Sequence, residues 1–317
     1  MGSQENVKHF TLTLAITLVL FLSGLAIPLA GILLLPLVPH PPLAFGVRYG
    51  KKNAFWLLLL ASAILFLFKG HEVALSFLFF VLIVVLLISF FGRGWTIEAV
   101  VVSTAAGVLA AASMVLISLA GSLSRLNEVA REALNENLHI SLGLYEKAGF
   151  PSETINAVRE DASRVVDIVL QITPALVFIS LVAMVLINLL LLSYRFPKNR
   201  AFFFSMSDPK EWRSPELLIW CFILSGFSLF FPPSLGLRAL GLNLLLACSL
   251  FYFFQGLAIV TYFFHHKKVP IFIRSVGYVL IAFQQLFTLL VVGLGLFDLW
   301  GDFRRLNKRD LNPDEIA

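Results

Sequence analysis

Residues 77–91 read FLFFVLIVVLLISFF, and this stretch decides the class of fold. It contains no charged residue and no alternation between apolar and polar positions. A transmembrane strand alternates with a period of two, because one face meets lipid and the other meets the lumen. In hydrocarbon, a segment without that alternation pairs its backbone polar groups only as a helix. The stretch therefore predicts a membrane-spanning helix.

The composition extends this prediction to most of the chain. Of the 317 residues, 59% are hydrophobic and 14% are charged, whereas soluble chains carry about 25% charged residues. We expect an all-α, polytopic helical membrane protein in the lipid bilayer, with about eight or nine transmembrane segments. The candidate spans are residues 10–27, 30–45, 54–68, 73–91, 96–120, 172–194, 216–231, 237–264 and 271–297.

The second candidate span is interrupted by prolines at positions 36, 39, 41 and 42. Each proline removes a backbone donor from the helix. A broken segment at membrane depth is tolerated only where protein or a water-filled cavity covers it. We therefore expect residues 28–46 to form a non-ideal helix that other spans cover and that lines the cavity of a ligand site.

Basic residues in short loops predict the orientation, because Lys and Arg favour the cytoplasmic side. One set of alternate loops, which includes residues 195–214, holds 13 of them, and the other set holds 6. The first set is predicted to be cytoplasmic, and this bias explains the net charge of +5 without a nucleic-acid partner. Four of the other six lie in the tail, which leaves the side of the C-terminus open.

A polar, net acidic insert interrupts the spans, and its apolar positions recur with helical spacing. We expect it to be a helical hairpin outside the cytoplasm. The predicted organisation has four parts. They are an N-terminal membrane bundle (1–120), the insert (121–171), a C-terminal membrane bundle (172–297) and a polar tail (298–317).

Motifs of soluble catalysis do not occur in the sequence. It lacks G-x-x-x-x-G-K-[ST], H-E-x-x-H, C-x-x-C and G-x-S-x-G. We expect no ATPase activity, no metal, no cofactor and no enzyme activity. A membrane enzyme acting on lipid is disfavoured as well, because the spans carry no paired acids or histidines at depth.

Polar residues inside the spans are the candidate ligand-binding residues, because such groups are costly in lipid and usually face the interior of a bundle. Two explanations stay open for them. They form hydrogen bonds between helices, or they line a site for an uncharged or partly apolar ligand. These residues are Asn188, Asn243, Gln255, Gln284 and Gln285.

Two further groups are candidate partner-docking residues. Asp298, Asp302 and Arg304 follow the last span, and helical spacing places them on one face beside the interfacial Trp300. We predict a solvated docking element there, the alternative being a helix end held by local ion pairs. Ala26 and Ala30, at four-residue spacing, mark a close helix contact within the chain or with a partner.

The order of short motifs along the chain resembles the YybS-like family of bacterial multi-pass membrane proteins. The motifs are Gly-x-Arg-Tyr-Gly (46–50), Tyr-Glu-Lys-Ala-Gly (145–149), Pro174, Asn188, Trp-Arg-Ser-Pro (212–215), Gln-Gly (255–256) and Gly-x-x-Asp-x-x-x-Asp-Phe-Arg (295–304).

This resemblance implies a distant relationship to the S components of energy-coupling-factor vitamin transporters. Those six-helix proteins bind a vitamin or metal, and an Ala-x-x-x-Ala pattern on their first helix meets a shared energising module. Ala26-x-x-x-Ala30 is similar to that pattern, whereas the number of spans, the insert and the lack of a vitamin-site motif depart from it.

We therefore expect a substrate-binding or transport-related component of the bacterial inner (plasma) membrane, with an energising or scaffold protein as its partner. The alternative is a membrane scaffold or regulatory protein that recruits partners through its loops and tail. The small-molecule ligand is not predicted.

Overall fold

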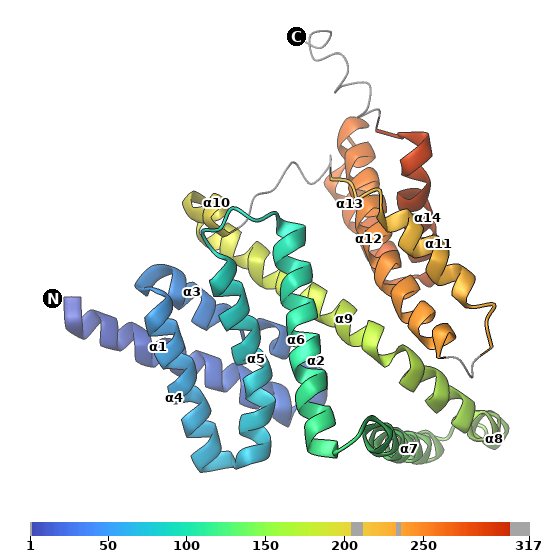
Figure 1. Cartoon of the computed structure of the whole chain (residues 1–317), viewed down its shortest axis with the longest axis horizontal. Helices are drawn as coiled ribbons and strands as arrows, with labels where there is room; N and C mark the ends of the chain where they lie inside the picture. The colour runs from blue at the N-terminus through green and yellow to red at the C-terminus, as the bar shows by residue number, and fades with distance from the viewer. Residues whose placement is uncertain (1, 204–211, 233–235, 305–317) are drawn as a thin grey trace, which may run out of the picture. The chain divides into compact units, whose positions relative to one another are not determined.

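The computed structural model describes residues 2–203, 212–232 and 236–304, and within these ranges it contains helices and no β-strand (Figure 1). The predicted all-α fold is confirmed. The helices are α1 (Gly2–Ala26), α2 (Pro28–Leu34), α3 (His40–Tyr49), α4 (Lys51–Lys69), α5 (His71–Phe90), α6 (Ile97–Ala120), α7 (Leu123–Lys147), α8 (Ser152–Glu160), α9 (Ala162–Arg195), α10 (Arg200–Phe203), α11 (Leu218–Ser228), α12 (Leu237–His266), α13 (Ile271–Phe283) and α14 (Gln285–Gly301).

Within the described ranges, seven helical segments are long and apolar enough to cross a membrane. The pair α13 and α14, which is bent by 99° at the break between the two helices, adds an eighth if it crosses the membrane as one broken span and none if it is re-entrant. The candidate span at residues 216–231 is an 11-residue helix, α11. At about 1.5 Å per residue, a straight helix of that length is too short for a hydrocarbon core of about 30 Å. The count therefore falls at the lower end of the prediction.

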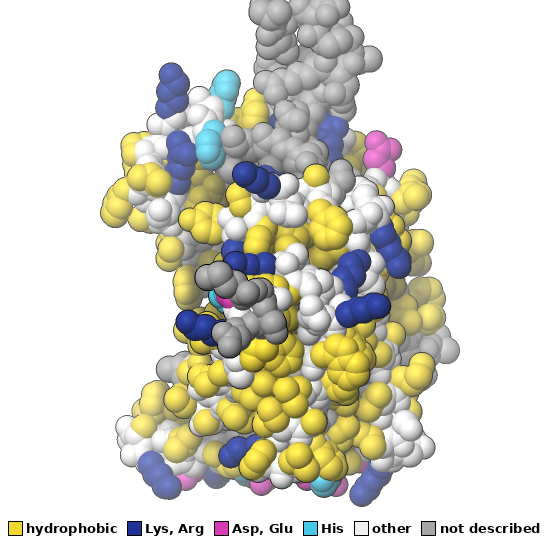
Figure 2. All heavy atoms as spheres, turned by 90° about the vertical axis from the view of Figure 1, so that its left-hand side faces the viewer, with side chains coloured by type: hydrophobic (Ala, Val, Ile, Leu, Met, Phe, Trp, Pro, Cys, Tyr) yellow, Lys and Arg dark blue, Asp and Glu magenta, His cyan; other side chains and the backbone are white. Residues whose placement is uncertain are grey.

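Large apolar side chains cover the outside of the spans. On α4, for example, Leu67 and Phe68 are 76% and 79% exposed. Figure 2 shows a broad band of hydrophobic side chains, with most Lys and Arg side chains above the band or at the lower edge. An exposed apolar surface of this kind is typical of a protein whose surroundings are lipid.

The chain divides into two compact units, whose limits fall inside α7 and α9. Unit 1 comprises Met1–Val129 with Ser180–Met206, and unit 2 comprises Ala130–Ile179 with Ser207–Ala317. In unit 1, Phe21 of α1 is fully buried against Phe77 of α5, with ring centroids 5.0 Å apart. In unit 2, α12 packs against both α11 and α14.

The insert is a pair of helices followed directly by α9, as the predicted hairpin requires. Gly149, with φ of +82°, lies in the turn between α7 and α8. Arg159 of α8 pairs with Glu146 of α7 at 2.9 Å, and Arg131 of α7 pairs with Asp167 of α9 at 2.5 Å. Exposed ion pairs of this kind fix orientation and contribute only about 0–1 kcal/mol each.

The proline-rich segment is broken, as predicted. A 3-10 turn, Leu35–Leu37, separates α2 from α3. Val38 is 1% exposed and Leu43 is fully buried, so other spans cover the break. The segment also lines a cavity. That this cavity is a ligand site stays a prediction.

Candidate functional site

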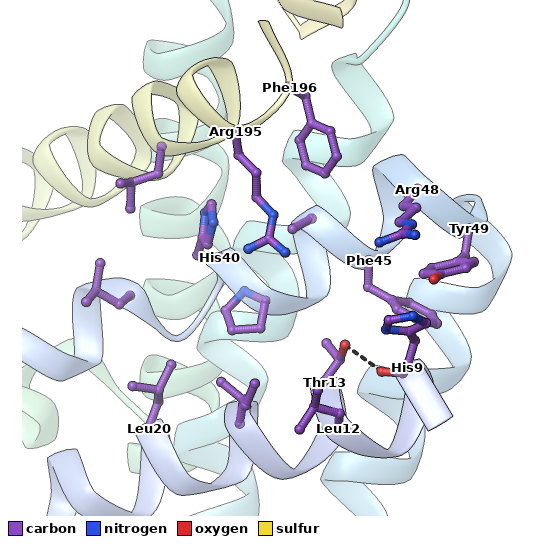
Figure 3. Close-up of a pocket in the computed structure, with 15 residues that line it drawn as sticks. His9, Leu12, Thr13, Leu20, His40, Phe45, Arg48, Tyr49, Arg195 and Phe196 are labelled. Carbon is purple, nitrogen blue, oxygen red and sulfur yellow. Dashed lines mark hydrogen bonds between the residues drawn. The ribbon is translucent and has the colours of Figure 1, made fainter. Parts of the chain in front are cut away.

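The cavity lies in unit 1 between α1, α3 and the end of α9, and its volume is about 400 Å³ (Figure 3). One wall is apolar and includes Leu12, Ile16 and Leu20 of α1. Four basic or ionisable side chains from three separate segments also line the cavity, and one of them, His9, lies on α1 itself. These are His9, His40, Arg48 and Arg195.

The broken segment positions two of these side chains. His40 is the first residue of α3 and Arg48 the ninth, so about 12 Å of helix rise separates them. Arg195, the last residue of α9, reaches down beside His40, and Arg48 points toward the same space from the far end of α3 (Figure 3).

Contacts on either side of Arg195 fix the end of α9 within unit 1. Upstream, Asn188 donates from Nδ2 to the carbonyl oxygen of Pro36 at 2.8 Å. Downstream, the N–H of Gly92 donates to the carbonyl oxygen of Phe202 at 2.8 Å. The guanidinium group therefore projects from a helix end that is held at both sides.

Among the described residues, one carboxylate lies near the basic side chains of the cavity, because Oε1 of Glu5 is 3.9 Å from Nε2 of His9. No carboxylate lines the cavity. Within the described ranges, neither Arg48 nor Arg195 forms an ion pair; their contacts are with the rings of Tyr49, at 5.3 Å, and Phe196, at 5.9 Å. The buried Nδ1 of His40 has no hydrogen-bond partner among those residues. The cavity thus offers cationic donors beside an apolar wall.

Asn188 and Asn243, two of the predicted ligand-binding residues, bind backbone beside a proline. The carbonyl of Pro36, which accepts from Asn188, lies three residues before Pro39, and Pro39 has no N–H to donate to it. Asn188 is fully buried and also donates to the carbonyl of Met184 at 2.7 Å. It forms a bond between segments, which is one of the two predicted explanations.

Asn243 forms hydrogen bonds with the backbone of α9 beside Pro174, through which the helix continues. In a regular helix the N–H of Ala175 donates to the carbonyl of Gln171. Here Asn243 of α12 bridges these groups. Its Oδ1 accepts from Ala175 N–H and its Nδ2 donates to the Gln171 carbonyl, both at 2.7 Å. The amide thereby satisfies two backbone groups in the turn that the proline opens.

Gln284 and Gln285 are exposed and lie at the break between α13 and α14. None of the five predicted ligand-binding residues lines the cavity. A ligand-binding role for these two glutamines stays a prediction.

A buried polar cluster lies in unit 2, where the end of α14 meets the residues before α11. Asp298 and Arg304 form an ion pair with 2.7 Å between Oδ2 and Nη2, and neither side chain is exposed. Gln255 of α12 donates from Nε2 to the same carboxylate oxygen at 3.2 Å. Oδ1 accepts from the N–H of Phe303 at 3.0 Å. Protein donors therefore occupy both oxygens of the carboxylate.

Residues 212–214 complete this cluster. The N–H and the hydroxyl of Ser214 both donate to Oε1 of Gln255, the N–H at 3.1 Å. Arg304 donates from Nη1 to the carbonyl oxygen of Trp212 at 3.0 Å. Beside them, Arg213 and Asp302 form a second, partly exposed ion pair. The cluster joins three segments of unit 2, and the Asp298 carboxylate has no oxygen left without a protein donor.

The predicted solvation of Asp298 and Arg304 is therefore wrong. Helical spacing assumes that α14 continues past Arg304, but α14 ends at Gly301 and Asp302 takes a left-handed conformation with φ of 36°. The chain turns back there and brings the guanidinium of Arg304 onto Asp298. Trp300 is 68% exposed, as an interfacial residue requires. The predicted tail beyond Arg304 lies outside the described residues.

The alanine pair lacks the geometry assumed for it. Ala26 is the last residue of α1 and Ala30 lies in α2. Between the helices, Ile27 is extended, with φ of −122° and ψ of 101°. The two alanines therefore do not share one face of one helix. The close contact lies between two glycines, because a Cβ on Gly31 would lie 2.5 Å from the carbonyl oxygen of Gly24.

We expect the C-terminal tail to be cytoplasmic, because residues 302–304 contact residues 212–213, at the end of the predicted cytoplasmic segment. The bent pair α13–α14 can return the chain to the side from which it starts. A green fluorescent protein fused after residue 317 should therefore fluoresce, and alkaline phosphatase fused there should be inactive. The opposite pair of results would contradict this topology.

The cavity residues were not singled out in the sequence. Arg195 belongs to the basic residues that predict the cytoplasmic side, Arg48 belongs to these and to the Gly-x-Arg-Tyr-Gly motif, and no sequence pattern assigns a role to His9 or His40. One signal is present in the sequence. Arg48 and Arg195 each follow the C-terminal end of a candidate span, and neither has an acidic residue near it in the sequence.

Comparison with known proteins identifies one family. A family model described as "Predicted membrane protein (DUF2232)" matches residues 15–299, a range that begins within α1 and ends within α14. No curated protein and no solved structure matches the chain.

Proposed function

Because the chain belongs to this family of predicted membrane proteins, we propose that it is a substrate-binding or transport-related component of the membrane, without an ATPase or other enzyme activity of its own. The observation that carries the proposal is the cavity between α1, α3 and α9. It is built from spans and not from a soluble domain, so a ligand enters it from the membrane or its surface.

The dimensions of the cavity support this function. Small-molecule sites are typically clefts of about 300–1,000 Å³, mostly apolar, with a few polar groups that fix orientation. The cavity of about 400 Å³ has this character, with a leucine and isoleucine wall opposite His40 and the two arginines. A broken helix contributes to it, as irregular backbone at membrane depth commonly does where it lines a cavity.

The resemblance to the YybS-like family, and through it to S components, also supports a substrate-binding or transport-related role. We place the protein in the bacterial inner membrane with an energising or scaffold protein as its partner. Because Ala26 and Ala30 lie on two helices, the contact with such a partner does not follow the single-helix pattern.

The alternative is a scaffold or regulatory protein. One observation favours it, namely that the start of the tail and the end of the basic segment before α11 meet through residues 302–304 and 212–213. A partner that recognises polar segments would find both at one end of unit 2.

Ile16→Trp tests the binding function. Ile16 lines the cavity and is 43% exposed, so an indole there fills the cavity without overpacking the core. We expect the full chain, purified in mild detergent, to carry a small molecule that mass spectrometry detects. Ile16→Trp should reduce its occupancy by about tenfold, the effect of about 1.4 kcal/mol on binding.

Val19→Trp is the matched control. Val19 lies on the same helix, is 62% exposed and does not line the cavity. The occupancy of the bound small molecule in Val19→Trp should equal that in the unchanged protein. Equal occupancy in Ile16→Trp, or no bound molecule in any variant, would contradict a binding role for the cavity and leave the scaffold as the better hypothesis.

A further inference from the structure

We propose that the cavity binds an anionic lipid, with the phosphate head group between Arg48 and Arg195 and an acyl chain along α1. The proposal rests on the function above, because it names the ligand class of the same cavity. It departs from the uncharged or partly apolar ligand expected from the spans alone, since the cavity is lined by residues at the ends of the spans.

The two guanidinium groups select for an anion. Arg48 and Arg195 project into a cavity without a carboxylate, and their positions against Tyr49 and Phe196 hold the planar groups in place. An arginine side chain presents a rigid fork of donors that matches phosphate oxygens, often in a bidentate manner. Two such forks, for which the described residues provide no carboxylate partner, suit one phosphate group.

His40 supplies a further polar group on the same side. Its Nδ1 is buried and has no hydrogen-bond partner within the described ranges, and a buried polar atom without a partner is unfavourable. The imidazole lies beside Arg195 in Figure 3. A phosphate oxygen at this position would act as the acceptor that the protein does not provide.

The opposite side of the cavity fits an apolar chain. Leu12, Ile16 and Leu20 follow one another at four-residue intervals along one face of α1 and span about 12 Å. Figure 3 shows Leu20 at the far end of the cavity from Arg48. Head group and chain therefore have separate places, which a free inorganic anion would not use.

The predicted orientation brings such a lipid to the cavity. Arg48 and Arg195 belong to the set of basic residues predicted to face the cytoplasm, and anionic phospholipids are held in that leaflet. Basic pockets between spans on this side are suited to phosphate head groups. A lipid entering from the leaflet has its head group level with the arginines and its chain directed into the bilayer.

The test compares three probes on the full chain in detergent by native mass spectrometry. The probes are dioctanoyl phosphatidic acid, dioctanoyl phosphatidylcholine and inorganic phosphate. We expect phosphatidic acid to bind at least about tenfold more tightly than either of the others. The double variant Arg48→Gln, Arg195→Gln should lose about tenfold or more of that affinity, because the neutral amides no longer form charge-assisted hydrogen bonds with the phosphate.

The matched control removes two charges from the same end of unit 1 outside the cavity. Lys52 and Lys198 are exposed and do not line it. The variant Lys52→Gln, Lys198→Gln should bind phosphatidic acid within about twofold of the unchanged chain. Equal losses in both double variants would show a general effect of surface charge and overturn the proposal.

The remaining outcomes separate the sources of the ligand. Inorganic phosphate binding as tightly as phosphatidic acid would show a free-anion site, and equal binding of the zwitterionic lipid would show an apolar cavity without anion selection. Either result overturns this inference while leaving the Ile16→Trp test of the binding function unaffected. If the arginine double variant fails to fold, the single variant Arg195→Gln replaces it, since that side chain lies on the exposed end of α9.

Discussion

Replacing Asp298 by asparagine is expected to lower the free energy of unfolding by about 3–5 kcal/mol, because the change removes the carboxylate that pairs with the buried guanidinium of Arg304. Both side chains are fully buried, and the pair also joins Gln255 and the backbone of Trp212 to the end of α14. The measurement is reversible unfolding of the full chain in mixed micelles. Asparagine keeps the shape of the side chain, so the loss reports charge and hydrogen bonding.

Glu146→Gln is the control for Asp298→Asn. Glu146 also pairs with an arginine, Arg159 at 2.9 Å, but the two side chains are 52% and 53% exposed. Its removal should change the free energy of unfolding by no more than about 1 kcal/mol. If the two variants lose equal stability, the Asp298 carboxylate is solvated and the surface docking element becomes the better description.

The second large effect is expected from Gly295→Ala, which should lower the free energy of unfolding by about 1–3 kcal/mol through overpacking. A Cβ on Gly295 of α14 would lie 1.9 Å from the carbonyl oxygen of Tyr252 of α12. A Cβ on Gly256 of α12 would lie 1.9 Å from the carbonyl oxygen of Val291. The clash is with backbone atoms, which cannot move away as the end of a flexible side chain can. An alanine at either position therefore forces α12 and α14 apart.

Gly293→Ala should show the opposite sign. Gly293 lies on the same helix, two residues away, and apart from its chain neighbours and the nearby backbone of α14 no atom of the described residues lies within 4 Å of a Cβ built there. Alanine there removes the helix cost of glycine, about 0.5–1 kcal/mol, and should stabilise the protein slightly. Unfolding of both variants in the same micelles is the measurement, and equal destabilisation would show that the close contact of α12 with α14 is absent.

Local pattern predicts most elements of the fold, but it does not predict that α11 has only 11 residues or that α13 and α14 are separate helices. Apolar runs such as residues 77–91 identify membrane helices, because lipid leaves the backbone few alternatives. The prolines between positions 36 and 42 predicted a broken segment for the same reason. Asn188 and Asn243 bind backbone groups at the two proline sites. Spacing along the chain could not decide between such hydrogen bonds and a ligand-binding role for these residues.

Tertiary contacts account for what local pattern could not predict. The cavity joins side chains from residues 9–49 with others from residues 191–196, so its composition depends on how distant helices meet. The pairing of Arg304 with Asp298 requires the chain to turn back after α14, and it does so at Asp302, which is in a left-handed conformation. Helical spacing predicts which residues share a face only while the helix continues. The end of α14 at Gly301 was not predicted from the residues between Asp298 and Arg304.

The bridge that Asn243 forms at Pro174 imposes an order on the biogenesis of the protein. Asn243 follows Ala175 by 68 residues in the chain, so α9 is synthesised well before the side-chain amide of Asn243. At about 5–20 residues per second, the delay is roughly 3–14 s. During that time the opened turn has two backbone groups that lipid cannot satisfy. We therefore expect this turn to stay in contact with water or protein until α12 has been synthesised.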